Sequence, residues 1–423
     1  MRKMKDSNIQ WVGQIPINWQ VEKNKHCFKL EKNIVGENMK DYNLLSLTKK
    51  GVIKKDENST GGKVPESFET YQSVKKGQMV MCLFDLDVSA VFSGLSSYDG
   101  MISPAYKIYN CNKNIYNNYA KYWFQYCFDG RKYKAYSKSL RYVVNTEDFE
   151  QIDILLPPRE EQEKIANFLD KKVTKIDNVI EKTKETIEDY KKYKQSIITK
   201  AVTKGLDKNV EMKDSGIDWY EKIPNNYKVV SIKSIFRIYT GATPKTDNKE
   251  NWDGNIAWIT PSDYKTDEKY VLVGDRTITE KGYKSCGTSL VPKGSLIFSK
   301  RAPIGTVAIS KIELCTNQGC LACVKKNDEI NVEYYYYMFS GLVNEFNLYG
   351  TGTTFKEIST TNFSDFKVLL PSKFEQNKIV DHLNKKIENI DNLIERKVKI
   401  IEELEQYKKS LIYEYVTGKK EVI

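Results

Sequence analysis

The chain has 423 residues, 40% hydrophobic and 12% aromatic, which suits two or more folded domains and excludes a disordered chain. It has no run of about 18 apolar residues and no apolar segment near its start, so we expect neither a membrane span nor secretion. The net charge, 67 − 56 = +11, fits a nucleic-acid-binding protein, although a soluble lysine-rich protein would also show it. Eight cysteines without framework spacing fit reduced thiols in a cytoplasm.

The opening segment of the chain recurs 214 − 6 = 208 residues later. "DSNIQWVGQIPINWQV" at Asp6 and "DSGIDWYEKIPNNYKV" at Asp214 match at 8 of 16 positions without a gap. A second pair of matching segments starts at Phe149 and Phe363, at an offset of 363 − 149 = 214. A solenoid has repeats of roughly 20–50 residues, so this is not one. We expect a duplicated two-domain unit, with a variable middle between repeated flanks in each half.

Each variable middle consists of short β-type runs broken by Gly and Pro, such as "SLVPKGSLIFSKRAPIGTVAISK" in the second half. The segments "YAKYWFQYCF" and "VEYYYYMFSGLVNEF" are typical of short buried helices. The four tyrosines at 334–337 favour core packing over stacking on bases, because they lie in an amphipathic helical pattern. Each middle is therefore expected to be an α+β domain of about 150 residues.

The end of each half has the apolar spacing of a coiled-coil helix, with Lys and Glu between the apolar positions. Pro157, Pro158 and Pro371 mark the predicted starts, and Gly205 and Gly418 mark the ends. About 40 helical residues would span roughly 60 Å, and the nearest partner for such a rod is its own copy. Two separate surface helices are the alternative. The predicted seam positions are Ile165, Leu169, Ile176 and Ile180 in the first helix and Ile379, Leu383, Ile390 and Ile394 in the second.

The sequence offers no catalytic constellation. Its two histidines provide little for histidine-based hydrolysis, and no phosphate-binding Gly-rich loop with the Gly-Lys-Ser/Thr ending occurs. Cys320 and Cys323 have a metal-like spacing, but a single pair without a second is a weak signal, and "GCLACV" reads as a strand with buried thiols. We therefore expect a protein that is not an enzyme and holds no metal.

Several segments stand in a specific order along the chain: the "IP" openings at 15–16 and 223–224, "GATPKTDNKENWDGNIAWITPSDY" from Gly241, "PKGSLIFSKRAPIGTVAI", "TNQG" at 316–319, and the helix starts "LLPPREEQEKI" and "LLPSKFEQNKI". These segments and their order resemble the specificity subunit of type I restriction–modification enzymes, over essentially the whole chain. The first middle departs from the family pattern: it lacks the "GxTP" loop and has "FDLD" where the second has "SKRA".

The resemblance implies an α+β fold: two α/β target-recognition domains in a pseudo-twofold tandem repeat, separated by two long antiparallel coiled-coil helices. Each recognition domain would read one half of a bipartite DNA target, and the helices would set the spacer. The implied boundaries are 1–156 and 214–370 for the recognition domains, 157–204 and 371–417 for the spacer helices, 205–213 for the linker and 418–423 for the tail.

The resemblance also implies partners. Two modification subunits would dock on the helices, and motor/nuclease restriction subunits would complete a complex that directs adenine methylation and restriction of double-stranded DNA. S-adenosylmethionine, ATP and Mg are expected on those partner subunits, with no cofactor on this chain. The competing hypotheses are a stand-alone coiled-coil DNA-binding regulator and a structural adaptor.

Candidate DNA contacts are loop residues with cationic, hydroxyl or aromatic side chains, since phosphates and base edges bind such groups. In the second domain we expect Thr243, Lys245, Lys300, Arg301, Thr353, Thr354 and Lys356. In the first domain "YSKSLRY" lies where "GTGTTFK" does at the offset of 214, and we expect Ser137, Lys138, Arg141, Tyr142 and also Lys63.

Overall fold

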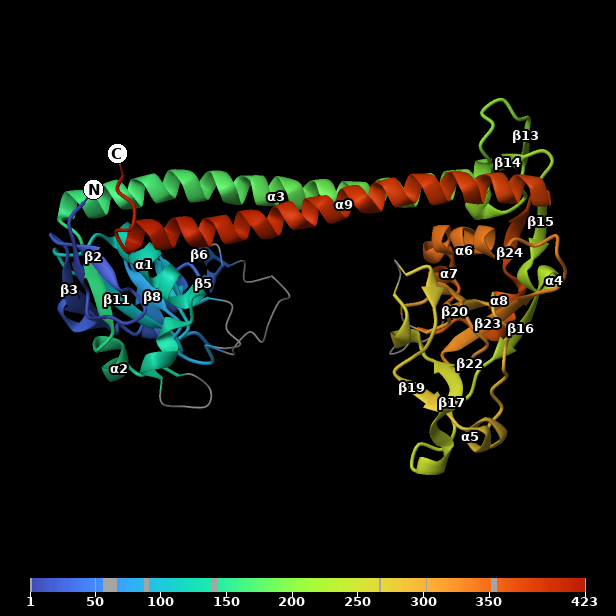
Figure 1. Cartoon of the computed structure of the whole chain (residues 1–423), viewed down its shortest axis with the longest axis horizontal. Coiled ribbons are helices and arrows are strands. Elements are labelled where there is room, and N and C mark those ends of the chain that lie inside the picture. Colours follow the sequence, from blue (N-terminus) through green and yellow to red (C-terminus); the bar gives the residue numbers. More distant parts are fainter. Residues whose placement is uncertain are drawn as a thin grey trace. The chain divides into compact units, whose positions relative to one another are not determined.

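The computed structural model of the chain describes residues 2–49, 51–55, 67–86, 91–137, 143–265, 268–301, 303–350 and 356–422 (Figure 1). It divides into two compact units. Unit 1 comprises Met1–Thr183 and Val398–Ile423, and unit 2 comprises Lys184–Lys397. Each unit therefore contains one α+β domain, the first part of one long helix and the last part of the other.

Unit 1 is built from short strands around a four-stranded antiparallel sheet of order β4-β11-β8-β9. The strands are β1 (Met4–Asp6), β2 (Gln14–Pro16), β3 (Gln20–Lys23), β4 (Phe28–Glu31), β5 (Leu45–Thr48), β6 (Gly51–Lys54), β7 (Gln72–Val74), β8 (Met79–Met81), β9 (Ser93–Leu95), β10 (Gly100–Ile102), β11 (Lys107–Cys111) and β12 (Asp153–Leu156). Its helices are α1 (Asn117–Asp129) and α2 (Thr146–Glu150), with 3-10 turns at Asn24–His26, Gly36–Asp41 and Lys132–Tyr136.

Unit 2 has a five-stranded sheet of order β16-β23-β20-β21-β18 and a three-stranded sheet of order β19-β17-β22. The strands are β13 (Met212–Asp214), β14 (Lys222–Pro224), β15 (Lys228–Ser231), β16 (Phe236–Thr240), β17 (Trp252–Ile259), β18 (Tyr270–Val271), β19 (Arg276–Ile278), β20 (Leu296–Ser299), β21 (Val307–Ser310), β22 (Cys315–Thr316), β23 (Cys320–Lys325) and β24 (Lys367–Leu370). The helices are α4 (Ile232–Ile235), α5 (Glu280–Lys284), α6 (Val332–Gly341), α7 (Val343–Leu348) and α8 (Thr360–Asp365), with 3-10 turns at Asp218–Tyr220, Lys249–Asn251 and Pro261–Asp263.

The repeated flanks of the sequence pair with each other within each unit. In unit 1, β12 pairs with β3 and places Leu155 opposite Val21. In unit 2, β24 pairs with β15 and places Leu369 opposite Val229, the repeat equivalents of those residues. Two segments far apart in sequence thus pair in each unit, and the repeated flanks form the same pair of strands in both.

Both predicted buried helices are present, as α1 and α6, and they lie in the cores of their units. The side chains of Tyr334–Tyr337 are at most 7% exposed, so the prediction that they pack in the core is confirmed. The α+β fold class is confirmed as well.

The two long helices are α3 (Arg159–Lys204) and α9 (Lys373–Val416), of 46 and 44 residues. They begin one and two residues after the predicted proline signals, and Gly205 and Gly418 follow their ends with φ of +72° and +69°, the left-handed conformation of a helix C-terminus. Seven of the eight predicted seam residues are buried and Ile394 is half-buried. The seam has a second role that the pattern did not reveal: the first turns of each helix, with Ile165 and Ile379, belong to the core of the adjoining α+β domain.

Candidate nucleic-acid interface

Five segments of unit 2 come together at one place, and we call residues 241–245, 260–263, 299–301, 316–319 and 356–358 the loop cluster. Gly241 permits the closest approach, because a Cβ there would lie 2.1 Å from the Thr316 carbonyl oxygen. Three main-chain hydrogen bonds join the segments: Ala242 N to Thr316 O (3.0 Å), Lys300 N to Gly319 O (2.9 Å) and Ile358 N to Lys300 O (3.0 Å). A fourth, from Asn317 N to Ile259 O (2.9 Å), holds the residue directly before the segment 260–263.

Thr243 and Gln318 meet in the loop cluster. The Thr243 hydroxyl donates to Gln318 Oε1 at 2.5 Å, which fixes the orientation of an exposed side-chain amide. Ser262 is exposed in the neighbouring turn, where its hydroxyl lies 2.7 Å from that of Thr260. Amide and hydroxyl groups held in this way can pair with base edges or phosphates.

The loop that carries Lys245 is anchored through its main chain. The Lys245 carbonyl accepts from Asn251 Nδ2 at 3.1 Å and from Trp252 Nε1 at 3.2 Å, and the Ala242 carbonyl accepts from Trp258 Nε1 at 3.0 Å. The Lys245 side chain is exposed. A rigid main chain with an exposed cation is suited to a phosphate contact.

Lys300 and Arg301 follow β20, as predicted, but both are paired with an acid. Lys300 Nζ lies 2.8 Å from Glu357 Oε1, and Arg301 Nε lies 2.9 Å from Glu357 Oε2. The Lys300 side chain is only 14% exposed, whereas Arg301 is 46% exposed. Arg301 is therefore the more accessible of the two for a ligand.

The remaining predicted DNA contacts are less well defined. Lys356 Nζ donates to the Asn347 carbonyl at 3.4 Å, and Ser137 Oγ donates to the Val143 carbonyl at 3.1 Å. The other predicted contacts lie outside the described residues: Lys63, Lys138, Arg141, Tyr142, Thr353 and Thr354.

Sequence reasoning did not nominate Gln318 or Ser262 as DNA contacts, although both lie in segments that carry the family resemblance. The available signal was chemical: Gln318 carries an amide and Ser262 a hydroxyl, and strand pairing brings Gln318 beside the nominated Thr243. What the sequence lacked was the strand order that joins "GATPK", "TPSDY" and "TNQG".

A buried glutamine attaches each domain to the start of its long helix. Gln162 accepts from Tyr116 N at 2.7 Å and donates to the carbonyls of Asn114 (3.0 Å) and Pro157 (2.9 Å). Gln376 makes the equivalent bonds in unit 2, accepting from Asn331 N at 2.8 Å and donating to the carbonyls of Glu329 (3.1 Å) and Pro371 (3.0 Å). Both glutamines are at most 1% exposed, so these bonds are shielded from water.

A tyrosine attaches each domain to the end of the other helix. The Tyr119 hydroxyl donates to the Val416 carbonyl at 3.2 Å in unit 1, and the Tyr334 hydroxyl donates to the Val202 carbonyl at 3.0 Å in unit 2. Since the last carbonyls of a helix have no partner within it, the tyrosine satisfies a group that would otherwise be buried alone.

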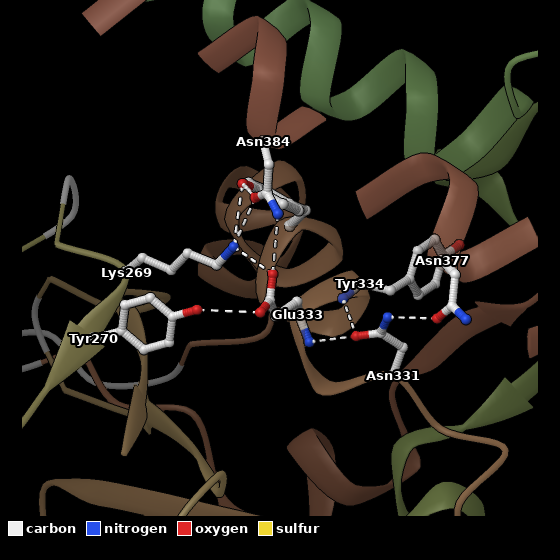
Figure 2. Close-up of polar contacts among 8 residues, drawn as sticks. Lys269, Tyr270, Asn331, Glu333, Tyr334, Asn377 and Asn384 are labelled. Carbon is white, nitrogen blue, oxygen red and sulfur yellow. Dashed lines mark hydrogen bonds and ion pairs between the residues drawn. The ribbon is translucent and has the colours of Figure 1, made fainter. Parts of the chain in front are cut away.

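A larger polar network surrounds the attachment in unit 2 (Figure 2). Lys269 Nζ lies 2.6 Å from Glu333 Oε2 and 2.8 Å from Asn384 Oδ1, and the Tyr270 hydroxyl donates to Glu333 Oε1 at 3.1 Å. Burial alone would raise the pKa of Glu333, but the hydrogen bonds from Lys269 and Asn384 outweigh burial and lower it. The network joins the segment before β18, helix α6 and helix α9.

The two helices run antiparallel within each unit, with equivalent ion pairs. In unit 1 Asp177 lies 2.6 Å from Lys408, and in unit 2 Asp391 lies 2.7 Å from Lys194. The residue numbers sum to the same value, 177 + 408 = 585 and 194 + 391 = 585, so both units have the same helix register.

The cysteine pair is not arranged as a metal site. Cys320 and Cys323 lie in β23 and are fully buried, as predicted, and burial raises the pKa of Cys320 to about 12. Across the residues that the structure describes, no three His, Cys, Asp or Glu side chains are grouped as metal ligands. Nor does any described helix combine the length and apolar character that crossing a membrane requires.

The fold places the chain in a class of proteins with two copies of one α+β domain, each joined to the same two long helices. A family model, the type I restriction modification DNA specificity domain, matches residues 96–189 and 224–406. The chain therefore belongs to this family.

Two curated relatives come from Methanocaldococcus jannaschii. The specificity subunit of the type I restriction enzyme MjaIX is 40% identical over 178 residues, or 41% of this chain and 40% of that protein. The MjaX specificity subunit, named as putative, is 28% identical over 279 residues, or 65% and 61%. The chain thus matches less than two thirds of the length of either relative.

A solved chain from a type I R-M system has the same fold, with a TM-score of 0.73 at 15% identity over 96% of this chain and 99% of that one.

Proposed function

We propose that the chain is the specificity subunit of a type I restriction–modification system that acts on double-stranded DNA in the cytoplasm. Each α+β domain, within the bounds 1–156 and 214–370, contacts one half of a bipartite target. The observation that carries this proposal is the combination of matched flanks and unlike loops: β3 with β12 and β15 with β24 have the same register, whereas the loop cluster of unit 2 has different side chains from its counterpart in unit 1.

The counterpart positions follow from the strand register. In unit 1, Met79 of β8 pairs with Tyr109 of β11, and in unit 2, Leu296 of β20 pairs with Cys323 of β23. Met79 and Leu296 are therefore equivalent positions. Counting on from each, Leu83 and Phe84 correspond to Lys300 and Arg301. The bond from Val144 N to the Leu83 carbonyl (2.8 Å) corresponds to the bond from Ile358 N to the Lys300 carbonyl. The segment of unit 1 that is equivalent to "SKRA" is therefore "CLFD" and not the expected "FDLD". Two domains with the same strand arrangement but different side chains in their loops are suited to contact two unrelated half-sites.

We assign the spacing of the half-sites to the helices α3 and α9. Their common register, with paired residue numbers that sum to 585 in both units, supports a helix pair of fixed length. A rigid pair of helices can define a gap between half-sites as dimer geometry does in other DNA-binding proteins.

The helices also offer a docking surface for two modification subunits. In unit 1 Val179 and Tyr407 are 48% and 54% exposed, and in unit 2 their repeat equivalents Leu393 and Tyr193 are 40% and 57% exposed. Each stands directly before a residue of the apolar seam or of the Asp–Lys ion pairs, and such positions flank the seam of a coiled coil. Two equivalent apolar patches suit two copies of one partner, and we propose that each takes an amphipathic helix of a modification subunit.

Catalysis then belongs to the partners. Modification subunits would hold S-adenosylmethionine and methylate adenine, and motor/nuclease subunits would use ATP and Mg. A stand-alone regulator or a structural adaptor is not favoured, because the chain belongs to the specificity family.

The test is to express the chain with the modification gene from its own locus in cells without other methyltransferases and to sequence the methylome. The proposal predicts one bipartite motif with a fixed gap, and no methyl transfer by the purified chain with S-adenosylmethionine alone. A continuous motif, no motif, or methylation by the chain alone would contradict it.

A further inference from the structure

The Arg301 side chain is held in one orientation by an ion pair, as expected of a residue that is positioned before its ligand binds. Its Nε donates to Glu357 Oε2 at 2.9 Å, while the second carboxylate oxygen, Oε1, is paired with Lys300 Nζ at 2.8 Å. The guanidinium is thereby held through Nε, and its two terminal nitrogens form a planar fork that pairs with none of the residues that the structure describes. The side chain is 46% exposed, so this fork is accessible.

The main chain around Arg301 is fixed as well. Its carbonyl accepts from Ser299 Oγ at 2.9 Å, and an isolated antiparallel bridge pairs Arg301 with Glu357. Burial alone would raise the pKa of Glu357, but the hydrogen bonds from Lys300 and Arg301 lower it, so the carboxylate is charged near neutral pH. Little conformational freedom is left for a ligand to remove, which favours affinity and specificity.

The neighbouring carboxylate decides between two kinds of ligand for this fork. A phosphate approaching Arg301 would also approach Glu357, whose negative charge cancels one of the two positive charges of Lys300 and Arg301 and so weakens the attraction. A base edge carries no net charge. A fork of two N–H donors matches the O6 and N7 acceptors of guanine in the major groove.

The first domain shows that the fold does not require these charges. Leu83 and Phe84 stand where unit 2 has Lys300 and Arg301, and Val143 stands at the repeat position of Glu357, since 143 + 214 = 357. All three charged residues are thus replaced together by apolar ones. A general phosphate contact would be useful at both half-sites, whereas a contact to one base is useful at only one.

We infer that Arg301 reads a guanine in the half-site contacted by unit 2 and that Glu357 is a positioning residue for it. The inference rests on the proposed function.

The experiment selects bound DNA from a library of duplexes randomised at the target positions. It uses the full chain assembled with the modification subunit and compares wild type with Arg301→Lys, Glu357→Gln and the control Arg237→Lys. Arg237 is an exposed arginine of β16 in the same domain. Arg301→Lys keeps the charge but loses the fork, so guanine preference at one position of one half-site should fall about tenfold or more.

Glu357→Gln should weaken the same preference without changing any other position, and Arg237→Lys should change nothing. The dependence of binding on salt is measured in parallel. A retained guanine preference in Arg301→Lys overturns the inference. So does a uniform loss across all sequences with a smaller salt slope, which would identify a phosphate contact. Both results leave the proposed function intact, whereas a wild-type complex that selects no bipartite motif overturns both.

Discussion

Replacing Gln376 by methionine tests whether the buried glutamines attach the domains to the helices. The side chain is 0% exposed and serves three main-chain groups: the N–H of Asn331 and the carbonyls of Glu329 and Pro371. Methionine has a similar length and shape but serves none of them. Gln162→Met removes the equivalent bonds in unit 1.

The expected cost follows from the groups left without partners. Each buried polar group that loses its hydrogen bond costs about 1 kcal/mol or more, so three cost about 3 kcal/mol. The apolar end of methionine recovers about 1 kcal/mol through burial, which leaves a loss of about 2 kcal/mol. For a unit of 397 − 184 + 1 = 214 residues, the melting temperature of unit 2 should fall by roughly 4–8 °C.

Scanning calorimetry of the full chain measures this shift, with Gln406→Met as the control. Gln406 is an exposed glutamine of α9, and its replacement should shift the melting temperature by less than about 2 °C. If Gln376→Met unfolds at the same temperature as this control, the glutamine is not an attachment point and the reasoning from its hydrogen bonds is refuted.

Three further changes test other parts of the structure. Glu333→Gln should make the melting temperature fall less steeply as the pH is lowered. Because folding lowers the pKa of Glu333 from its ordinary value of 4.5, the carboxylate stabilises the fold above that pH, and this contribution is lost as the pH falls below it. Calorimetry between about pH 6 and pH 3 that gives the wild type and the variant equal slopes would contradict this. The double variant Tyr193→Glu with Tyr407→Glu should keep the melting temperature within about 2 °C of the wild type but weaken co-purification with the modification subunit at least tenfold. The control, Lys192→Glu with Gln406→Glu at exposed positions of the same helices, should not weaken co-purification. Equal retention of the modification subunit by both double variants would contradict the proposed docking surface. Inserting one heptad in each helix, near Thr183 and Lys397, adds about 10 Å, so the methylated gap should grow by about three base pairs with unchanged half-sites, and an unchanged gap at full activity would mean that the helices do not set it.

The sequence predicted the parts of the fold that depend on local pattern. The spacing of apolar residues identified both long helices, and Pro158, Pro371, Gly205 and Gly418 located their ends to within two residues, because these residues act on the adjacent backbone alone. The buried tyrosines of α6 were predicted from the same kind of pattern.

The sequence did not predict what depends on strand pairing. The loop cluster is assembled by β16, β17, β20, β22 and β23, whose order in the sheets is not their order in the chain. Gln318 therefore went unrecognised as the partner of Thr243, and Glu357 as the partner of Lys300 and Arg301. Gln162 and Gln376 were visible as a repeated residue, but only the structure shows that both are buried and bonded to the main chain.

Exchanging one recognition domain tests the central claim, that each domain reads one half of a bipartite target independently of the other. The second domain, residues 214–370, is replaced by that of a family member with a different motif, and the repeated flanks that form β15 and β24 keep the junctions matched. Methylome sequencing of cells that carry the hybrid and the modification gene gives the result directly. The account predicts a motif in which one half-site is new, the other is unchanged and the gap is the same. A motif in which both half-sites change together would contradict it.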